Sequence, residues 1–144
     1  MIYHATFSAD DNGTLLVHFP DVPAAITFGV DERDARLRAR NALAAALEMI
    51  VERKQALPAQ TFTGGCAIQL RGLHAAKIAL HVAMRESRVT KAALAKRLGL
   101  HPSQVDLLLD FKRASRLDAL EDALDAVKPT PQKSSRKKLT SQSL

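Results

Sequence analysis

Residues 91–105 read KAALAKRLGLHPSQV, and this stretch decides the fold of the rear half of the 144-residue chain. Counting from Lys91, the fifth residue is Ala95, the ninth is Gly99 and the fifteenth is Val105. In a helix-turn-helix the fifth residue is small because the two helices cross there, and glycine suits the left-handed backbone of the turn. The fifteenth residue packs its apolar side chain back on the first helix. The spacing therefore predicts a helix-turn-helix.

The residues on either side complete the predicted unit. Thr90 is the expected N-cap, and Pro102 fits the first turn of the second helix, where its missing N–H costs nothing. A helix from Leu73 to about Glu86 precedes the unit, and a helix over residues 117–124 follows it as a packing partner. The alternative interpretation is an α-helical interaction module without a role in DNA binding.

A helix-turn-helix places the first residues of its second helix against base edges. We expect that helix to run from Pro102 to Asp110, where glutamine can pair bidentately with adenine and serine can serve several bases. Lysine and arginine at the ends of the unit suit the phosphates. Later in the helix, Asp106 and Asp110 argue against base contacts because they would repel phosphates. The candidate base contacts are Ser103 and Gln104, and the candidate phosphate contacts are Lys91, Lys112 and Arg113.

The front half begins with a hairpin. Residues 2–8 and 15–19 alternate like half-buried strands, and turn residues lie between them. A three-residue loop that ends in a left-handed Gly13 pairs Phe7 with Val17, and it would also pair Ala5 with Phe19. That register puts the apolar side chains on one face, whereas a two-residue loop puts them on opposite faces. The sequence therefore predicts the three-residue loop.

A short strand, a long helix and a fourth strand follow the hairpin. The third strand covers residues 26–28 and ends at Gly29, the helix runs from Asp31 to about Lys54, and the fourth strand covers residues 66–70. Alanines recur on one stripe of the helix and allow it to lie close to a thin sheet. The element order of the front half is therefore βββαβ.

The charge divides the chain into three parts. Residues 1–70 carry a net charge of −2, residues 71–128 carry +4, and residues 129–144 carry +4 without any acidic residue. An acidic front and a basic rear indicate two modules with different partners. The expected fold class is α+β, with a βββαβ domain over 1–70 and an all-α helix-turn-helix domain over 71–128. Residues 129–144 have almost no apolar content and are expected to be a basic disordered tail, which either adds nonspecific DNA affinity or only solubility.

The composition excludes several classes of protein. The single cysteine, Cys66, excludes a disulfide scaffold and suits a reducing compartment. No apolar run approaches the ~20 residues of a membrane span, and the N-terminus has no export signal, so we expect a cytoplasmic protein. The front half has no glycine-rich phosphate loop, no paired catalytic carboxylates on a strand end and no Ser/His/Asp order. We therefore expect no enzyme activity, no catalytic residues, no metal site and no cofactor.

Two short motifs of the front half carry a family resemblance. Phe19-Pro20-Asp21-Val22-Pro23 follows the hairpin, and Thr27-Phe28-Gly29 precedes the helix. With these motifs, residues 1 to about 127 resemble a HicB-type antitoxin of a bacterial type II toxin–antitoxin system. The rear half resembles the version of that family with a lambda-repressor-like (Xre) helix-turn-helix. Ala24 departs from the pattern, because the family often has glycine there.

The resemblance implies two partners. A partial RNase H-like front domain without nuclease activity would mask a small, basic, mRNA-cleaving HicA-type toxin. The rear domain would form a homodimer or higher homo-oligomer and repress its own operon by binding double-stranded operator DNA. Two prolines fix the loop after the second strand, and a rigid loop loses little entropy on binding. The candidate toxin contacts are Phe19, Pro20, Asp21, Val22 and Pro23.

Two other functions remain open at this point. One is a single-component transcriptional regulator whose front domain binds a small ligand. The other is an RNase H-like hydrolase with an accessory DNA-binding domain. A toxin gene beside the coding region favours the antitoxin, and metal-dependent nuclease activity would favour the hydrolase.

Overall fold

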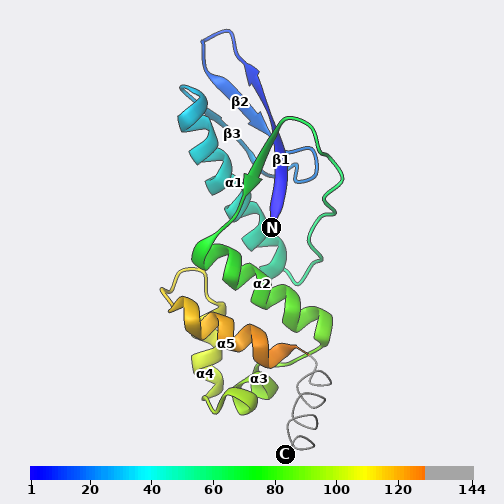
Figure 1. Cartoon of the computed structure of the whole chain (residues 1–144), viewed down its shortest axis with the longest axis vertical. Helices are drawn as coiled ribbons and strands as arrows, with labels where there is room; N and C mark the ends of the chain where they lie inside the picture. Colours follow the sequence, from blue (N-terminus) through cyan, green and yellow to red (C-terminus); the bar gives the residue numbers. More distant parts are fainter. Residues whose placement is uncertain (129–144) are drawn as a thin grey trace, which may run out of the picture.

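The computed structural model describes residues 1–128 and shows a mixed α/β chain, with an antiparallel four-stranded sheet and five helices. The strands are β1 (Ile2–Ala9), β2 (Leu15–His18), β3 (Ile26–Gly29) and β4 (Cys66–Gln69). The helices are α1 (Glu32–Glu52), α2 (Gly72–Ser87), α3 (Lys91–Leu98), α4 (Pro102–Leu109) and α5 (Leu117–Val127). Figure 1 shows the sheet and α1 at one end of an elongated molecule, α3 to α5 at the other end, and α2 between them. The expected basic tail lies outside the described residues.

The sheet has the strand order β3-β2-β1-β4, and every neighbouring pair is antiparallel. Phe7 lies opposite Val17, and Gly13 has a φ of 81°. The N–H of Asp10 donates to the carbonyl of Thr14 at 2.7 Å, which closes the loop. The predicted three-residue loop and its register are therefore confirmed. The predicted pair of Ala5 and Phe19 lies just beyond the β1–β2 ladder, which ends at Thr6 and His18.

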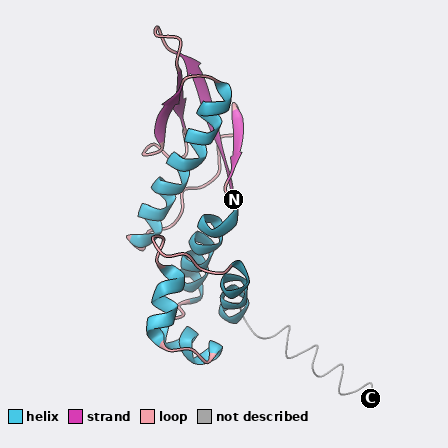
Figure 2. Cartoon of the chain, turned by 90° about the vertical axis from the view of Figure 1, so that its left-hand side faces the viewer, coloured by secondary structure: helices cyan, strands magenta, loops and turns pink. Residues whose placement is uncertain are grey.

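Helix α1 covers one face of the sheet (Figure 2) and begins where the sequence predicts. The Asp31 carboxylate accepts a hydrogen bond from the N–H of Asp34 at 2.8 Å, and the Asp34 carboxylate accepts one from the N–H of Val30 at 2.9 Å. These bonds satisfy backbone donors at the helix start. A Cβ on Gly29 would lie 2.4 Å from the backbone nitrogen of Ala35. Glycine therefore allows β3 and α1 to approach this closely.

Helix α2 joins two hydrophobic cores. Ile78 is buried with the sheet and with α1, whereas Leu80 and Met84 are buried with α3, α4 and α5. The first core also takes in the partly buried Val82 of α2. A helix that the sequence assigns to the rear half therefore packs on both halves of the molecule.

The segment that begins at residue 91 forms two short helices, α3 and α4, joined by a tight turn. Thr90 accepts a hydrogen bond from the N–H of Ala93 at 3.1 Å as the N-cap of α3. Gly99 ends α3 in the left-handed region, with a φ of 67°. Ala95 and Val105 are both buried where α3 and α4 pack together. The small Ala95, the left-handed Gly99 and the apolar Val105 therefore have the environments that the sequence predicts for them.

Candidate surfaces for nucleic acid and for a protein partner

The N-terminus of α4 carries both candidate base contacts, and both side chains take part in its cap. The N–H of His101 donates to Oε1 of Gln104 at 2.8 Å, and the hydroxyl of Ser103 lies 3.1 Å from Nδ1 of His101. All three residues are exposed. Bidentate pairing with adenine requires both the carbonyl and the amide of glutamine. Gln104 would therefore have to share or release its cap bond to read adenine in this way.

The candidate phosphate contact Lys91 forms an ion pair with α4. Its Nζ lies 2.7 Å from Oδ1 of Asp106, and both side chains are more than half exposed. An exposed pair of this kind is weak and is screened by salt. Phosphate and Asp106 would therefore compete for the Lys91 ammonium group.

The other two candidates, Lys112 and Arg113, are exposed residues of the segment that follows α4. The backbone of this segment is held by Lys77 of α2, whose side chain is only 2% exposed. The Lys77 ammonium donates to the carbonyls of Asp110 at 2.6 Å and Arg113 at 2.8 Å. It also lies 3.0 Å from the hydroxyl of Ser115 and 3.2 Å from the carbonyl of Leu107. Burial lowers the pKa of Lys77 because desolvation disfavours the charged ammonium.

Sequence reasoning missed this buried lysine, although a signal for it exists. Lys77 follows Leu73 by four positions and precedes Leu80 by three, so it occupies the apolar stripe of its helix. A second contact anchors the same region, because Nε2 of His81 lies 2.9 Å from the carbonyl of Leu109 and its ring stacks on Phe111. Helix α2 therefore holds the end of α4 in place through these contacts.

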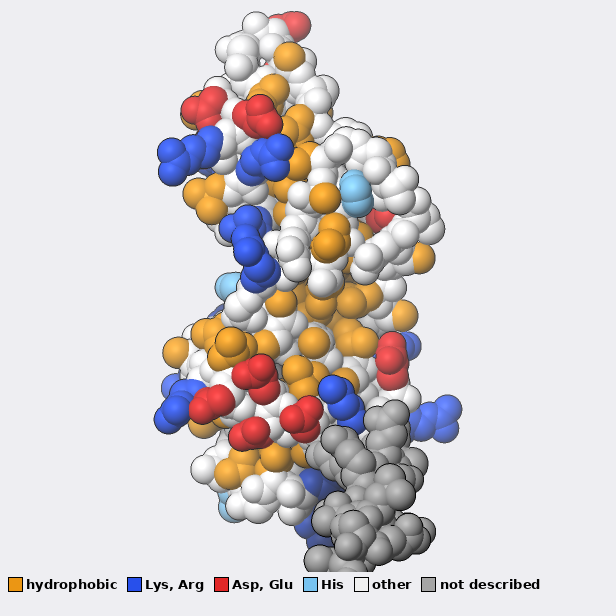
Figure 3. Space-filling view, viewed as in Figure 1, with side chains coloured by type: hydrophobic (Ala, Val, Ile, Leu, Met, Phe, Trp, Pro, Cys, Tyr) orange, Lys and Arg blue, Asp and Glu red, His pale blue; other side chains and the backbone are white. Residues whose placement is uncertain are grey.

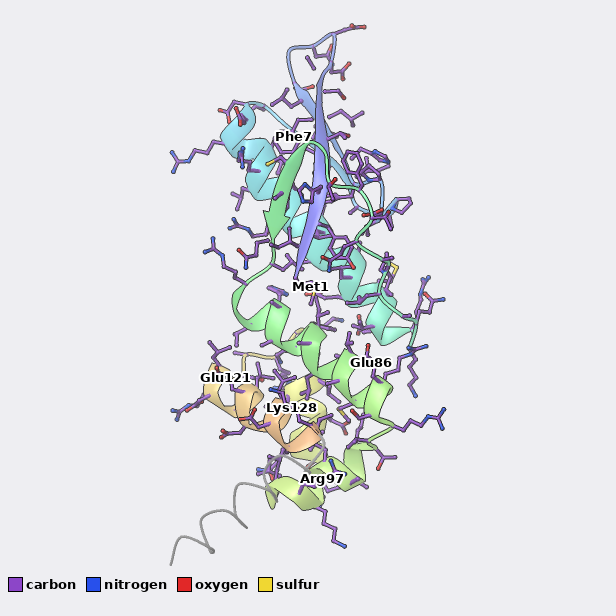
Figure 4. All side chains as sticks on the ribbon, turned by 45° about the vertical axis from the view of Figure 1, so that its right-hand side comes forward. Met1, Phe7, Glu86, Arg97, Glu121 and Lys128 are labelled. Atoms are coloured by element: carbon purple, nitrogen blue, oxygen red, sulfur yellow. The ribbon has the colours of Figure 1, made fainter. Side chains whose placement is uncertain are left out.

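The exposed surface of helix α5 is acidic. Figure 3 shows acidic side chains gathered over α5. These exposed residues are Asp118, Glu121, Asp122 and Asp125. Figure 4 shows Glu121 on α5 and Arg97 on α3, and the Arg97 guanidinium donates to the carbonyl of Ala126 at 2.9 Å. A polyanion would be repelled from this acidic α5 surface.

The structure changes the interpretation of the loop after β2. Phe19 and Val22 are 0% and 1% exposed, so their side chains belong to the core and do not face a partner. Pro20 is half-buried, whereas Pro23 is exposed. Of the five candidate toxin contacts, Pro23 presents its side chain most openly.

Asp21 holds two loops together. Its carboxylate accepts hydrogen bonds from the Thr61 hydroxyl at 2.6 Å, the Thr61 N–H at 2.8 Å and the Phe62 N–H at 2.8 Å. The Thr61 hydroxyl, followed by the Phe62 N–H, lowers the pKa of Asp21, since both stabilise the charged form. Both carboxylate oxygens of Asp21 therefore already accept hydrogen bonds from within the chain.

The sheet has an open face that sequence reasoning missed. On the side away from α1, Leu16, Ile26 and Phe28 are 43%, 58% and 61% exposed. Leu16 lies opposite Phe28 and His18 lies opposite Ile26 across β2 and β3. These apolar side chains therefore form one surface patch, and no helix of the described chain covers it.

The described part of the chain holds no evident metal or membrane element. Among residues 1–128, no group of three or more His, Cys, Asp or Glu side chains is arranged to hold a metal ion. None of the described helices is both long and apolar enough to cross a membrane.

An open groove of about 1180 Å³ lies between the end of α1 and helices α2 to α4, with both acids and bases in its lining.

The family model and the relatives that match this chain are all described as antitoxins. A family model described as "HicB_like antitoxin of bacterial toxin-antitoxin system" matches residues 2–79. The chain is 31% identical to Antitoxin HicB of Pseudomonas fluorescens, over 86% of this chain and 87% of that protein. It is 28% identical to Antitoxin HicB 2 of Photorhabdus laumondii, over 88% of this chain and 91% of that protein. It is also 28% identical to Antitoxin HicB of Escherichia coli K12, over 88% of this chain and 94% of that protein.

Proposed function

The chain belongs to the HicB-like family of bacterial antitoxins, and we propose that it neutralises a small mRNA-cleaving HicA-type toxin and represses its own operon. An antitoxin has a toxin as its partner and is not itself an enzyme. The observation that carries the proposal is the family match, which spans the sheet, α1 and the first half of α2. The relatives are named as antitoxins, which favours this function over a ligand-responsive regulator or a hydrolase.

Neutralisation is assigned to the front half of the chain, which we propose to be a partial RNase H-like domain acting in the cytoplasm. Its net charge of −2 has the sign that a basic toxin requires. Pro23 and the outer edges of Pro20 and Asp21 are the parts of the loop after β2 that a toxin can reach. Because Asp21 fixes this loop to residues 61–62, the loop is already rigid before a partner binds.

Repression is assigned to α3 and α4, which we propose to be an Xre-type helix-turn-helix. The left-handed Gly99 and the buried Ala95 and Val105 support that interpretation. Helix α4 would enter the major groove with its first turn, and a homodimer would read two half-sites. The acidic α5 surface then faces away from the DNA.

The toxin half of the proposal can be tested by growth. Expression of the toxin encoded beside this chain should stop growth, and co-expression of the full-length chain should restore it. Pro23→Lys changes an exposed residue of the proposed loop and should weaken rescue, because a charge at an interface must be desolvated. Asp11→Lys, at the exposed hairpin tip, is the matched control and should rescue fully. Full rescue by Pro23→Lys would remove this loop from the toxin interface.

The DNA half can be tested by gel shifts on the operator and on random DNA. Gln104→Ala should cost about 1–3 kcal/mol on the operator and little on random DNA. Because this change also removes a cap bond, Gln104→Glu serves as a control: it keeps an oxygen for the His101 N–H but has no amide to pair with a base. A thermal melt of both variants separates cap loss from base reading. Equal loss on both DNAs after Gln104→Ala would show that Gln104 does not read bases.

A further inference from the structure

A small hollow lies where α1 passes the start of α2. Its volume is about 300 Å³, and its lining comes from α1 and from the junction between β4 and α2. The lining includes Ala44 and Leu70, which are 8% and 3% exposed, and the exposed Ala45. Because both alanine side chains end at Cβ, they leave room for a small ligand. The volume is at the lower end of the range for ligand pockets, which is about 300–1,000 Å³.

Two arginines of this hollow have charges that the folded chain does not neutralise. Arg40 comes from α1 and Arg71 directly precedes α2, and both are exposed. Within residues 1–128, neither guanidinium group is part of an ion pair. By contrast, the guanidinium of Arg38 on the same helix lies 3.0 Å from the Asp34 carboxylate. The charges of Arg40 and Arg71 are therefore available to a ligand.

Only one acid, Glu48, is among the described residues that line the hollow, and it already has a partner. Its Oε1 is bonded to Nδ1 of His74, and its side chain is only 18% exposed. The hollow also includes the exposed Asn41, whose amide group can donate two hydrogen bonds. With two arginines against one paired acid, the hollow is net positive. An anion therefore meets donors here and little repulsion.

We propose that this hollow binds a phosphate group, either free or carried by a small molecule. A guanidinium group donates two parallel N–H bonds to a phosphate or a carboxylate, and these charge-assisted bonds are stronger than neutral ones. A phosphate has more acceptor oxygens than a carboxylate, so both arginines and Asn41 can share it. Two guanidinium groups beside one hollow repel each other, and a dianion relieves that repulsion more than a monoanion does.

The hollow is distinct from the surfaces proposed above for the toxin and for DNA. Figure 1 shows α2 between the sheet and the rear helices, so its start is remote from the far end that carries α3 and α4. The loop after β2 joins two strands at the other side of the sheet from β4. Phosphate binding at the hollow therefore does not depend on the proposed antitoxin function.

Isothermal titration calorimetry of the full-length chain with inorganic phosphate and with ribose 5-phosphate tests the proposal. Arg40→Gln and Arg71→Gln should each raise the dissociation constant at least about tenfold, because each removes charge-assisted hydrogen bonds. Arg40→Lys should bind with intermediate affinity, since lysine keeps the charge but lacks the paired donors. Arg38→Gln is the matched control, because it removes one charge of the same helix outside the hollow, and it should bind like the wild type.

The two ligands distinguish the two sources of the phosphate group. Tighter binding of ribose 5-phosphate would assign the hollow to a phosphorylated small molecule, and equal affinities would assign it to free phosphate. A wild-type chain that binds neither ligand at millimolar concentration would overturn the proposal. So would Arg40→Gln and Arg71→Gln variants that are folded in thermal melts and bind like the wild type. Equal weakening by Arg38→Gln would also overturn it, because the effect would then come from overall charge.

Discussion

Lys77→Met is expected to destabilise the protein through the end of α4. Lys77 is the one charged residue among the buried residues of the described chain, and its ammonium lies within 3.2 Å of four oxygens. Methionine keeps most of the apolar stem but has no N–H to donate. The carbonyls of Asp110 and Arg113 then lose their donor, and the segment that carries Lys112 loses its anchor.

The expected loss of stability is the difference between the hydrogen bonds that Lys77 makes and the cost of burying its charge. An ammonium group has three N–H donors, and each hydrogen bond to a charged group contributes roughly 1.5–3 kcal/mol. Desolvation of a buried ion offsets this by several kcal/mol. Water can reach the exposed Asp110 and Arg113 once the ammonium is gone, which reduces the penalty for unpaired carbonyls. We therefore expect Lys77→Met to lower the free energy of unfolding by about 2–4 kcal/mol, or roughly 5–15 °C in Tm.

Urea unfolding of the full-length chain, followed by circular dichroism, measures this change. Lys96→Met is the matched control, because Lys96 is an exposed lysine of the same helical half and its loss should change stability by no more than about 0.5 kcal/mol. If Lys77→Met unfolds at the same urea concentration as the wild type, the four contacts of Lys77 do not stabilise the end of α4.

Three further outcomes follow from contacts elsewhere in the chain. Asp21→Ala should lower the free energy of unfolding near neutral pH. Because the pKa of Asp21 is lowered from 3.8, its contribution to stability is present above 3.8 and is lost as the pH falls through the lowered pKa. The loss of stability on acid titration should therefore be shallower in the variant than in the wild type. Gly29→Ala should cost about 1–3 kcal/mol in urea unfolding, because the new Cβ meets the Ala35 backbone at 2.4 Å, and wild-type stability would contradict the close approach. Asp106→Asn should release Lys91 and tighten binding to any DNA at low salt in gel shifts, whereas unchanged affinity would exclude Lys91 as a phosphate contact.

Local sequence patterns were sufficient for the elements and for one register. Period-two alternation and the turn residues predict the Phe7–Val17 pair, and the cap residues Asp31 and Thr90 predict two helix starts. These features depend on residues close together in the chain. The left-handed Gly99 follows in the same way, because a tight turn between helices requires that backbone.

The contacts that sequence patterns could not predict join distant residues. Asp21 bonds to Thr61, forty positions away, and Lys77 bonds to Arg113, thirty-six positions away. Helical spacing places Lys77 on the apolar stripe of α2, but no periodic pattern identifies the distant partner in either bond. Strand alternation predicts two faces for the sheet but gives no sign that one face stays uncovered, because that depends on helix α1 packing on the other face. The sequence likewise makes Phe19 a candidate partner contact, whereas the folded chain buries its side chain completely.

Silencing of the toxin by this chain can be measured by a titration of RNA cleavage. Purified HicA-type toxin from the neighbouring gene is mixed with a messenger RNA and with increasing amounts of the full-length chain. Cleavage is expected to fall in proportion to the added chain and to stop when the toxin is fully bound. Undiminished cleavage in the presence of excess folded chain would contradict it.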